Sequence, residues 1–406
     1  MPALNRQAYL DWLRVLAIFG VLFFHSAMPF AAEETWHIKN KETSNLFLEF
    51  NFFLSRFRMP LLFFISGAVC FFMLKRRTAG QFIGLRFKRL FIPLIFGMLV
   101  IVPPQIYMER VANGYSGNFF QFYPSIFEGK PYPAGNTSWH HLWFILYLFI
   151  YDIVAAPFFL WVIKRKSPSF LNFINWMAHG KRIYLMLAVP VSAYVFLIGI
   201  FPQTNDLIHD WAMFVYWFSF VIAGFLVISQ QQLLESIVRN RRFSLLLAFI
   251  SLITINYLRW NGSEPWDTLD SWQNHPLTYL YRSLYVLLSY GAVFALVGYG
   301  KPYLNRQHKF LTYANPAVYP FYILHQTVIV ILAFYIVQVN ESILSKYLFL
   351  VGVSFLLCIG IYHLIIRENR LLRFLFGMKE EAESKNQKAE MRNEKVEIRN
   401  EKLEIV

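Results

Sequence analysis

Charged residues are scarce in this chain of 406 residues. Asp, Glu, Lys and Arg together make up 15% of the sequence, against 57% for hydrophobic residues. Average soluble domains carry roughly 25% charged residues, so this chain has too few to cover a water-facing surface. Cysteine is scarcer still: Cys70 and Cys358 both lie in apolar segments, and no disulfide framework is indicated.

Long apolar stretches are abundant instead. Most of them have 17–23 residues, the length that a membrane-spanning helix requires. The ten stretches are 10–30, 47–74, 86–105, 141–163, 184–201, 211–229, 243–259, 277–299, 316–338 and 346–366. The second is longer and is interrupted by Arg56, Arg58 and Pro60. The sequence therefore predicts an all-α polytopic membrane protein with about ten transmembrane helices.

The distribution of positive charge predicts the orientation of these helices. With the N-terminus inside, the four inner loops hold seventeen Lys and Arg residues and the five outer loops hold six. Positive residues favour the cytoplasmic side, so we expect both termini there. The net charge of +14 follows largely from this asymmetry. It is poor evidence for a nucleic-acid partner, and no segment resembles a nucleic-acid-binding module.

The first apolar stretch carries three ionisable side chains. Arg14 and His25 are eleven residues apart, which leaves them roughly 20° out of register and about 16 Å apart along an α-helix. Asp11 falls on the same face, one turn before Arg14. Ionisable groups inside a membrane are costly and usually mark a functional path. Alternatively, Arg14 extends to the cytoplasmic interface and His25 ends a packed helix.

Five short motifs, in order along the chain, resemble the acyltransferase 3 family of integral-membrane acyltransferases. They are Leu10-Asp11-Trp12-Leu13-Arg14 followed by His25, then RMPLLFFISG (58–67), Arg86-Phe87-Lys88-Arg89, HLWFILY (141–147) and YPFYILHQ (319–326). The last two are most similar to the subgroup that adds succinyl groups to periplasmic glucans. One departure is Leu148, which stands where many relatives carry a Glu. The resemblance covers almost all of residues 1–376, which we assign to one transmembrane domain.

The resemblance implies an O-acyltransferase in a bacterial cytoplasmic (inner) membrane. Such enzymes take an acyl group, acetyl or succinyl, from cytoplasmic acyl-CoA and place it on a hydroxyl of a periplasmic or cell-surface glycan. Acyl-CoA is then a donor substrate, and no bound cofactor is expected. Arg86, Lys88 and Arg89 lie where the third stretch meets the cytoplasm and are candidates to hold CoA phosphates. The alternative is that they serve topology alone.

His25 is the candidate catalytic base. The attacking hydroxyl must lose a proton, and imidazole has an ordinary pKa of about 6.5, which suits that task near neutrality. An acyl-imidazole intermediate is a second possible role for the ring. Arg14 is expected either to orient the thioester or to pair with Asp11. We include all three residues in the predicted catalytic site.

Further polar residues are candidates for acyl or acceptor contacts. His325 lies in the middle of the ninth stretch with Tyr322 one turn away, and His141 and Trp143 begin the fourth. His325 is equally well explained as a hydrogen-bonded core histidine. Arg58, with Arg56, is a candidate for the free carboxylate of a succinyl group or for lipid phosphate.

No metal site is expected. Near His140 and His141, no carboxylate or further His lies at ligand spacing along the chain, and the family resemblance implies no metal.

Two further expectations concern function class and the C-terminal segment. A transporter that uses buried Arg and His residues is the alternative to an enzyme, but the two halves show no inverted repeat. Residues 377–406 form a predicted charged cytoplasmic tail with a seven-residue repeat. Its apolar positions are two residues apart, unlike a coiled-coil seam, so a solvated helix is expected.

Overall fold

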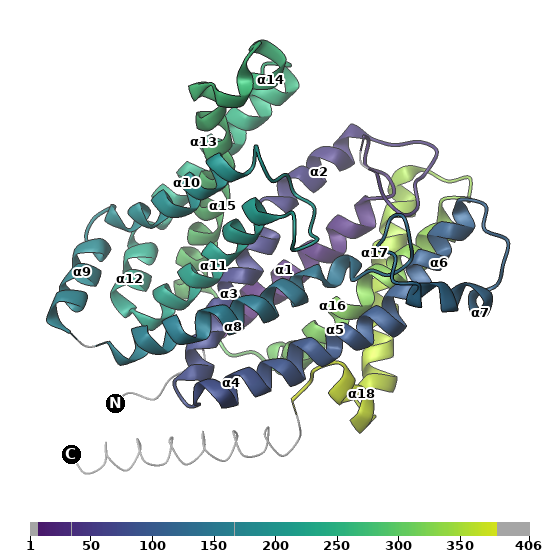
Figure 1. Ribbon diagram of the computed structural model, residues 1–406, viewed down its shortest axis with the longest axis horizontal. Helices are drawn as coiled ribbons and strands as arrows, with labels where there is room; N and C mark the ends of the chain where they lie inside the picture. Colours follow the sequence, from purple (N-terminus) through teal and green to yellow (C-terminus); the bar gives the residue numbers. More distant parts are fainter. Residues whose placement is uncertain (1–6, 34, 166, 380–406) are drawn as a thin grey trace.

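The computed structural model describes residues 7–33, 35–165 and 167–379. Within these ranges the regular structure is helical, apart from two isolated β-bridges (Figure 1). The predicted all-α class is therefore confirmed. The predicted tail lies outside the described residues from residue 380 onward.

Nine helices or helix series in the described residues are long and apolar enough to cross a membrane. They are α1 (Ala8–Ala27), α2 with α3 (Asn45–Ser55, Arg58–Leu74), α4 to α6 with η1 and η2 (Ala79–Arg86, Phe87–Phe91, Ile92–Phe96, Gly97–Ile101, Val102–Ala112), η4 with α8 (His140–Leu142, Trp143–Lys164), α11 (Trp211–Ser229), α13 with α14 (Arg241–Trp260, Pro265–Thr268), α15 (Pro276–Tyr303), α16 (Lys309–Ile336) and α17 with η7 (Ile343–Ile361, Tyr362–Ile366). The remaining short helices are α7 (Phe119–Phe122), η3 (Tyr123–Phe127), α12 (Gln231–Arg239), η6 (Trp272–Asn274) and α18 (Arg370–Leu375).

The fifth predicted stretch, 184–201, is not a straight span. Helix α9 (Pro168–Ala178) and the continuous pair η5 and α10 (Arg182–Leu187, Ala188–Leu197) meet at 104°. Gly180 lies in the break with a φ of 59°, the left-handed conformation in which helices commonly end and which glycine adopts without strain. Together the two arms make the tenth candidate span, so the predicted number of spans holds although this boundary was wrong.

The interruption predicted in the second stretch is real. Helix α2 ends at Ser55 and α3 begins at Arg58, so two non-helical residues separate them. Pro60 then falls in the first turn of α3, where its missing N–H leaves no intrahelical hydrogen bond unmade. Helix α3 packs most closely against α11 and also contacts α1 and α8, while α2 and α3 still count together as one candidate span.

Helices α3 and α11 approach each other closely enough for their backbones to touch. A Cβ atom added to Gly67 would lie 1.9 Å from the Val221 carbonyl oxygen, and one added to Gly224 would lie 1.9 Å from that of Phe64. Small residues allow this approach between helices in a membrane, where dispersion contacts rather than water exclusion favour packing. Helix α1 packs against α3, α15 and α16, which brings its ionisable side chains toward the interior.

Candidate active site

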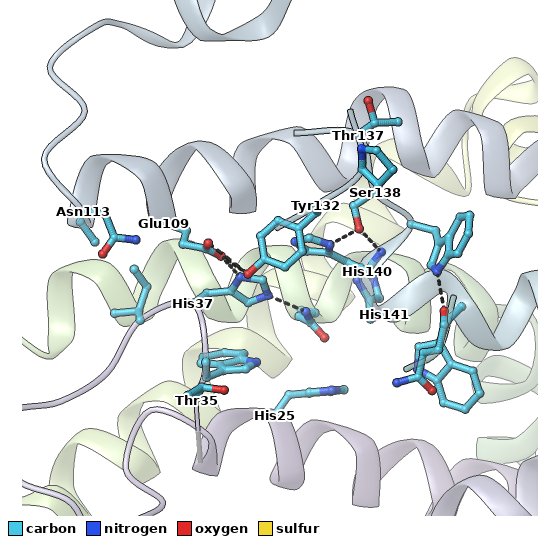
Figure 2. Close-up of a pocket in the computed structure, with 18 of the residues that line it drawn as sticks. His25, Thr35, His37, Glu109, Asn113, Tyr132, Thr137, Ser138, His140 and His141 are labelled. Carbon is cyan, nitrogen blue, oxygen red and sulfur yellow. Dashed lines mark hydrogen bonds and ion pairs between the residues drawn. The ribbon is translucent and has the colours of Figure 1, made fainter. Parts of the chain in front are cut away.

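A cavity of about 1340 Å³ opens at one end of the bundle, which we call the cavity end. Its walls combine the end of α1, the end of α6, η4 and α16 with the loops that hold residues 35–39, 131–139 and 204–209. Figure 2 shows His25 on α1 at one side, and Glu109, Tyr132 and His140 at the other. Loop segments far apart in sequence thus enclose the predicted base.

His25 and His325 form a hydrogen-bonded pair. His325 is fully buried, and its Nε2 lies 2.9 Å from Nδ1 of the half-buried His25. The other nitrogen, Nδ1 of His325, lies 2.5 Å from the Tyr322 carbonyl oxygen and so carries the proton. His325 Nε2 must then accept from His25 Nδ1, which leaves His25 Nε2 as the proton-accepting atom. This network assigns the tautomers, and it orients His25 as a base requires.

The predicted acyl and acceptor residues gather around this pair. His141 is buried, and its ring centroid lies 5.2 Å from that of His325. Its Nε2 donates to the Ile323 carbonyl at 2.9 Å, while Tyr322 donates its hydroxyl hydrogen bond to the His141 carbonyl. These hydrogen bonds therefore join η4 to α16, and His325 of α16 contacts His25.

Arg58 is buried close to the same residues. Its guanidinium carbon lies 3.6 Å from the centroid of the Phe24 ring, next to His25 in α1. Arg56 instead packs over Phe52 and Tyr285. The burial of Arg58 argues against contact with lipid phosphate, so the remaining hypothesis for it is an anionic group that enters the bundle.

Trp143 lines the cavity at the start of α8. Its ring centroid lies 5.4 Å from that of Tyr147 and 5.9 Å from that of Trp217. A rigid aromatic wall of this kind presents a flat apolar surface with a polar edge, which suits the ring face of a sugar.

Arg14 lies within α1, well away from the cavity residues. Its Nη2 is 3.2 Å from Asp11 Oδ1 and 2.7 Å from Asn315 Oδ1 on α16. The pairing with Asp11 was one of the two expected roles of Arg14. The contact with Asn315 was missed, because the two residues are 301 positions apart.

Arg86 differs from its neighbours Lys88 and Arg89. It is buried, and its Nε lies 2.7 Å from Oδ2 of the fully buried Asp152 on α8. Cys70 Sγ joins them, at 3.1 Å from Arg86 Nη2 and 3.0 Å from Asp152 Oδ1. Lys88 is exposed and Arg89 partly exposed, so the structure separates the three residues that the sequence had grouped.

Sequence reasoning missed Asp152 altogether. The signal was a single carboxylate in the apolar run of the fourth stretch, one turn after Leu148. Such a carboxylate requires a cationic partner from another span.

It also missed His37 and Glu109, which the structure brings together in the cavity wall with His140, a residue that the sequence analysis had considered and set aside as a metal ligand. His37 Nδ1 contacts a carboxylate oxygen of Glu109, and Tyr132 donates its hydroxyl at 3.1 Å to both oxygens of that carboxylate. Burial raises the pKa of Tyr132 to about 12, and the Glu109 carboxylate adds to this rise. Tyr132 is therefore a neutral donor near pH 7.

Comparison with known proteins supports the motif-based resemblance. The family described as an acyltransferase domain matches residues 7–363. Proteins named glucans biosynthesis protein C from Escherichia coli O1:K1 / APEC and from strain K12 / DH10B are each 24% identical over 407 residues, covering 96% of this chain and 98% of the relative. The protein of that name from Escherichia coli O81 (strain ED1a) is 25% identical over 404 residues, with the same coverage. No solved structure matches the chain. The motifs, the helical bundle and this match over nearly its whole length agree, and the chain belongs to the acyltransferase 3 family of membrane O-acyltransferases.

Proposed function

We propose that this protein moves an acetyl or succinyl group from cytoplasmic acyl-CoA to a hydroxyl of a periplasmic or cell-surface glycan. The single observation that carries the proposal is the His25–His325 pair at the cavity, which leaves His25 Nε2 to accept a proton. The names of the relatives, which refer to glucan biosynthesis, support a glycan as the acceptor. The inner membrane of a bacterium is the location that fits this reaction.

In the proposed reaction, the acceptor hydroxyl attacks the thioester carbonyl while His25 Nε2 takes its proton. The C–S bond then breaks, the CoA sulfur leaves as a thiolate, and the imidazolium returns the proton to it. The products are an ester and free CoA, so atoms and charges balance. Buried Arg58 packs over the ring of Phe24, the residue before His25, and is suited to hold the carboxylate of a succinyl group. Trp143 is suited to stack against the sugar.

The donor side of the proposal now depends on Lys88 and Arg89 rather than on Arg86. Both lie in η1, inside the helical series that begins at Ala79 and where the third predicted apolar stretch starts, and CoA phosphates bind such cations by charge-assisted hydrogen bonds. Arg86 is already paired with Asp152, so its proposed role is to fix the position of the segment that holds the other two.

Mass spectrometry of periplasmic and surface glycans tests this function. Cells that contain the protein should yield glycans with an acyl mass increment, and cells that lack it or contain His25→Ala should not. The size of the increment identifies the acyl group. Glycans that are identical in all three cultures would contradict the proposal and favour a transporter.

Reporter fusions test the orientation on which this reaction depends. Fusions after Lys75 and Arg165 should read cytoplasmic, and fusions after Glu33 and Glu128 should read external. A reversal of both pairs would place the cavity on the cytoplasmic side and exclude an external acceptor.

A further inference from the structure

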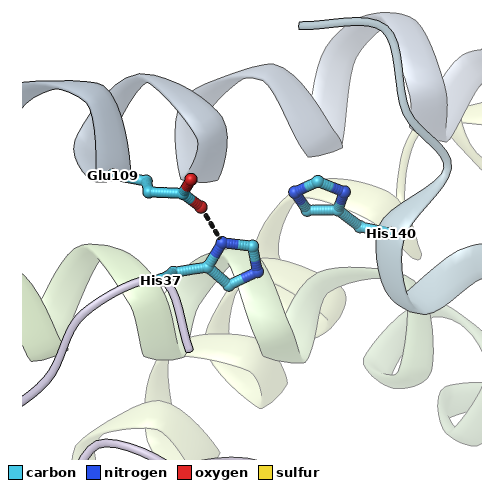
Figure 3. Close-up of side chains that lie close together, drawn as sticks. All are labelled: His37, Glu109 and His140. Carbon is cyan, nitrogen blue, oxygen red and sulfur yellow. Dashed lines mark hydrogen bonds and ion pairs between the residues drawn. The ribbon is translucent and has the colours of Figure 1, made fainter. Parts of the chain in front are cut away.

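His37, Glu109 and His140 come from three segments far apart in sequence, and their side chains point toward one another (Figure 3). One potential ligand atom from each lies within 4.8 Å of the other two. Zinc–nitrogen and zinc–oxygen bonds are about 2.0–2.2 Å long, so the ligand atoms of a tetrahedral zinc lie about 3.3 Å apart. The widest pair here needs to close by at most about 1.5 Å.

We propose that these three residues bind a divalent metal ion of the zinc class at the wall of the cavity. Two imidazoles and one carboxylate are a donor set that suits zinc, whereas magnesium and calcium prefer oxygen ligands alone. Three protein ligands leave the fourth position to water or to an incoming oxygen atom, as in zinc sites that act on a substrate. His37, Glu109 and His140 all line the cavity that His25 also lines.

The surroundings of His140 point to a ligand at its Nε2. Ser138 contacts Nδ1 of this ring, and Nε2 is buried with no hydrogen-bond partner among the described residues. A buried ring nitrogen without a partner is costly, and a metal ion would remove that cost. His140 also has a φ of 41°, a left-handed conformation that is strained for a residue other than glycine and that clusters at functional sites.

The other two ligands are held by neighbours of the kind that surround metal sites. Tyr132 donates to the Glu109 carboxylate, and the amide of Gln326 lies 3.3 Å from Nε2 of His37. With that amide flipped, its oxygen would accept from Nε2–H, which fixes the tautomer in which Nδ1 is free to bind metal. Every predicted ligand therefore has a residue that orients it.

This inference revises the expectation of no metal site. That expectation depended on spacing along the chain near His140 and on the family resemblance. Spacing along the chain does not show that the fold brings a carboxylate from α6 and a second imidazole from the loop after α1 to His140. The inference does not depend on the acyl-transfer reaction, since metal binding is measured directly.

Metal content of the full-length protein, purified in detergent with a tag that contains no histidine, tests the site. We expect about one zinc per chain by elemental analysis after dialysis, and binding of added zinc chloride to protein stripped with a chelator. Cobalt(II) should give the visible absorption bands of a tetrahedral site. Glu109→Gln and His140→Ala should each weaken zinc binding more than about a hundredfold, because loss of a ligand costs more than loss of a residue that orients one.

Two further variants distinguish a specific metal site from adventitious zinc binding. Tyr132→Phe keeps the ring and all three ligands, and should weaken zinc binding by roughly 10- to 100-fold. His209→Ala removes another histidine of the cavity wall, one that is paired only with Asp206, and should bind zinc as the wild type does. Zinc binding that is absent from the wild type, or equal in the wild type and in Glu109→Gln and His140→Ala, would overturn the proposal. His37 and Glu109 would then be a simple hydrogen-bonded pair.

Discussion

Two groups of polar side chains lie among these apolar helices, and they differ in whether a hydrogen-bonding atom remains available to a substrate. The group at the cavity end contains His25, His325 and His141, and it faces a cavity of about 1340 Å³. The other contains Arg86, Asp152 and Cys70, and Asp152 in it is fully buried. Placing either group inside a membrane costs free energy, so each is expected to have a structural or a functional role.

The difference lies in hydrogen bonding. In the buried group, Arg86 pairs with Asp152 and Cys70 bridges the two, so that each side chain has a partner inside the group. In the cavity group, both ring nitrogens of His325 are hydrogen-bonded, and this fixes His25, which donates through Nδ1 and keeps Nε2 for chemistry. A closed set of polar groups holds helices together, whereas an ordered but incomplete set can act on a substrate.

Removal of His25 Nε2, the nitrogen that the cavity group leaves available, should have the largest effect on activity. His25→Ala should lower the rate of acyl transfer by about 10²- to 10⁴-fold, the usual contribution of a positioned base. Abundance in the membrane and unfolding temperature should stay near wild type, since the side chain faces a cavity. Acylated glycan per molecule of protein is the measurement, with His179→Ala, an exposed histidine remote from the cavity residues, as control. Wild-type transfer by a correctly inserted His25→Ala protein would remove the distinction between the two groups.

Disrupting the buried group of Arg86, Asp152 and Cys70 should chiefly lower the stability of the protein. Asp152→Ala leaves the Arg86 guanidinium buried without its carboxylate and should lower the free energy of unfolding by about 3–5 kcal/mol. Unfolding in detergent and the amount of protein in the membrane are the measurements. Arg86→Met combined with Asp152→Leu should recover most of the loss, because an apolar pair of similar size needs no charge partner.

Asp206→Ala is the control for that experiment, because it removes an exposed carboxylate paired with His209 and should change stability by less than about 1 kcal/mol. Full stability together with lost activity in Asp152→Ala would show instead that Asp152 takes part in the reaction.

The same contrast explains what the sequence could predict. Hydropathy identified the spans, and motif spacing identified His25, His141, Tyr322 and His325, because both are properties of single segments. The structure brings these four together.

The partners of these residues were harder to predict. Arg86 and Asp152 lie on different helices, and His37 and Glu109 are 72 positions apart. Such contacts depend on tertiary packing, which a single sequence without aligned relatives does not show. The bend at Gly180 was missed for a related reason: hydropathy finds apolar length but not direction.

A smaller effect is expected where a side chain acts through His25. His325→Ala removes the acceptor that fixes the tautomer of His25, a hydrogen bond worth about 1 kcal/mol, so kcat should fall roughly fivefold with little change in KM. His325→Gln offers an amide oxygen to His25 Nδ1 and should restore part of kcat. Both variants should fold, and equal loss in the two would indicate that His325 has a purely packing role.

The smallest effect on kcat is expected for Lys88 and Arg89, the cations near the buried group, which are tested here as donor-binding residues. Lys88→Ala combined with Arg89→Ala leaves the Arg86–Asp152 pair in place, so it separates donor binding from the stability of that pair. Because Lys88 is exposed and Arg89 partly exposed to solvent and salt, each contact should be worth about 0.2–1 kcal/mol, and the KM for acyl-CoA should rise by roughly two- to thirtyfold for the pair. The value of kcat should hardly change, since contacts remote from the thioester stabilise the ground and transition states about equally. Raising the salt concentration should reduce the difference from wild type.

Topology is checked in the same variant by the fusion after Lys75. Normal topology with an unchanged KM would show that Lys88 and Arg89 serve orientation alone, and the donor site would then be sought first at Lys75, Arg76 and Arg77.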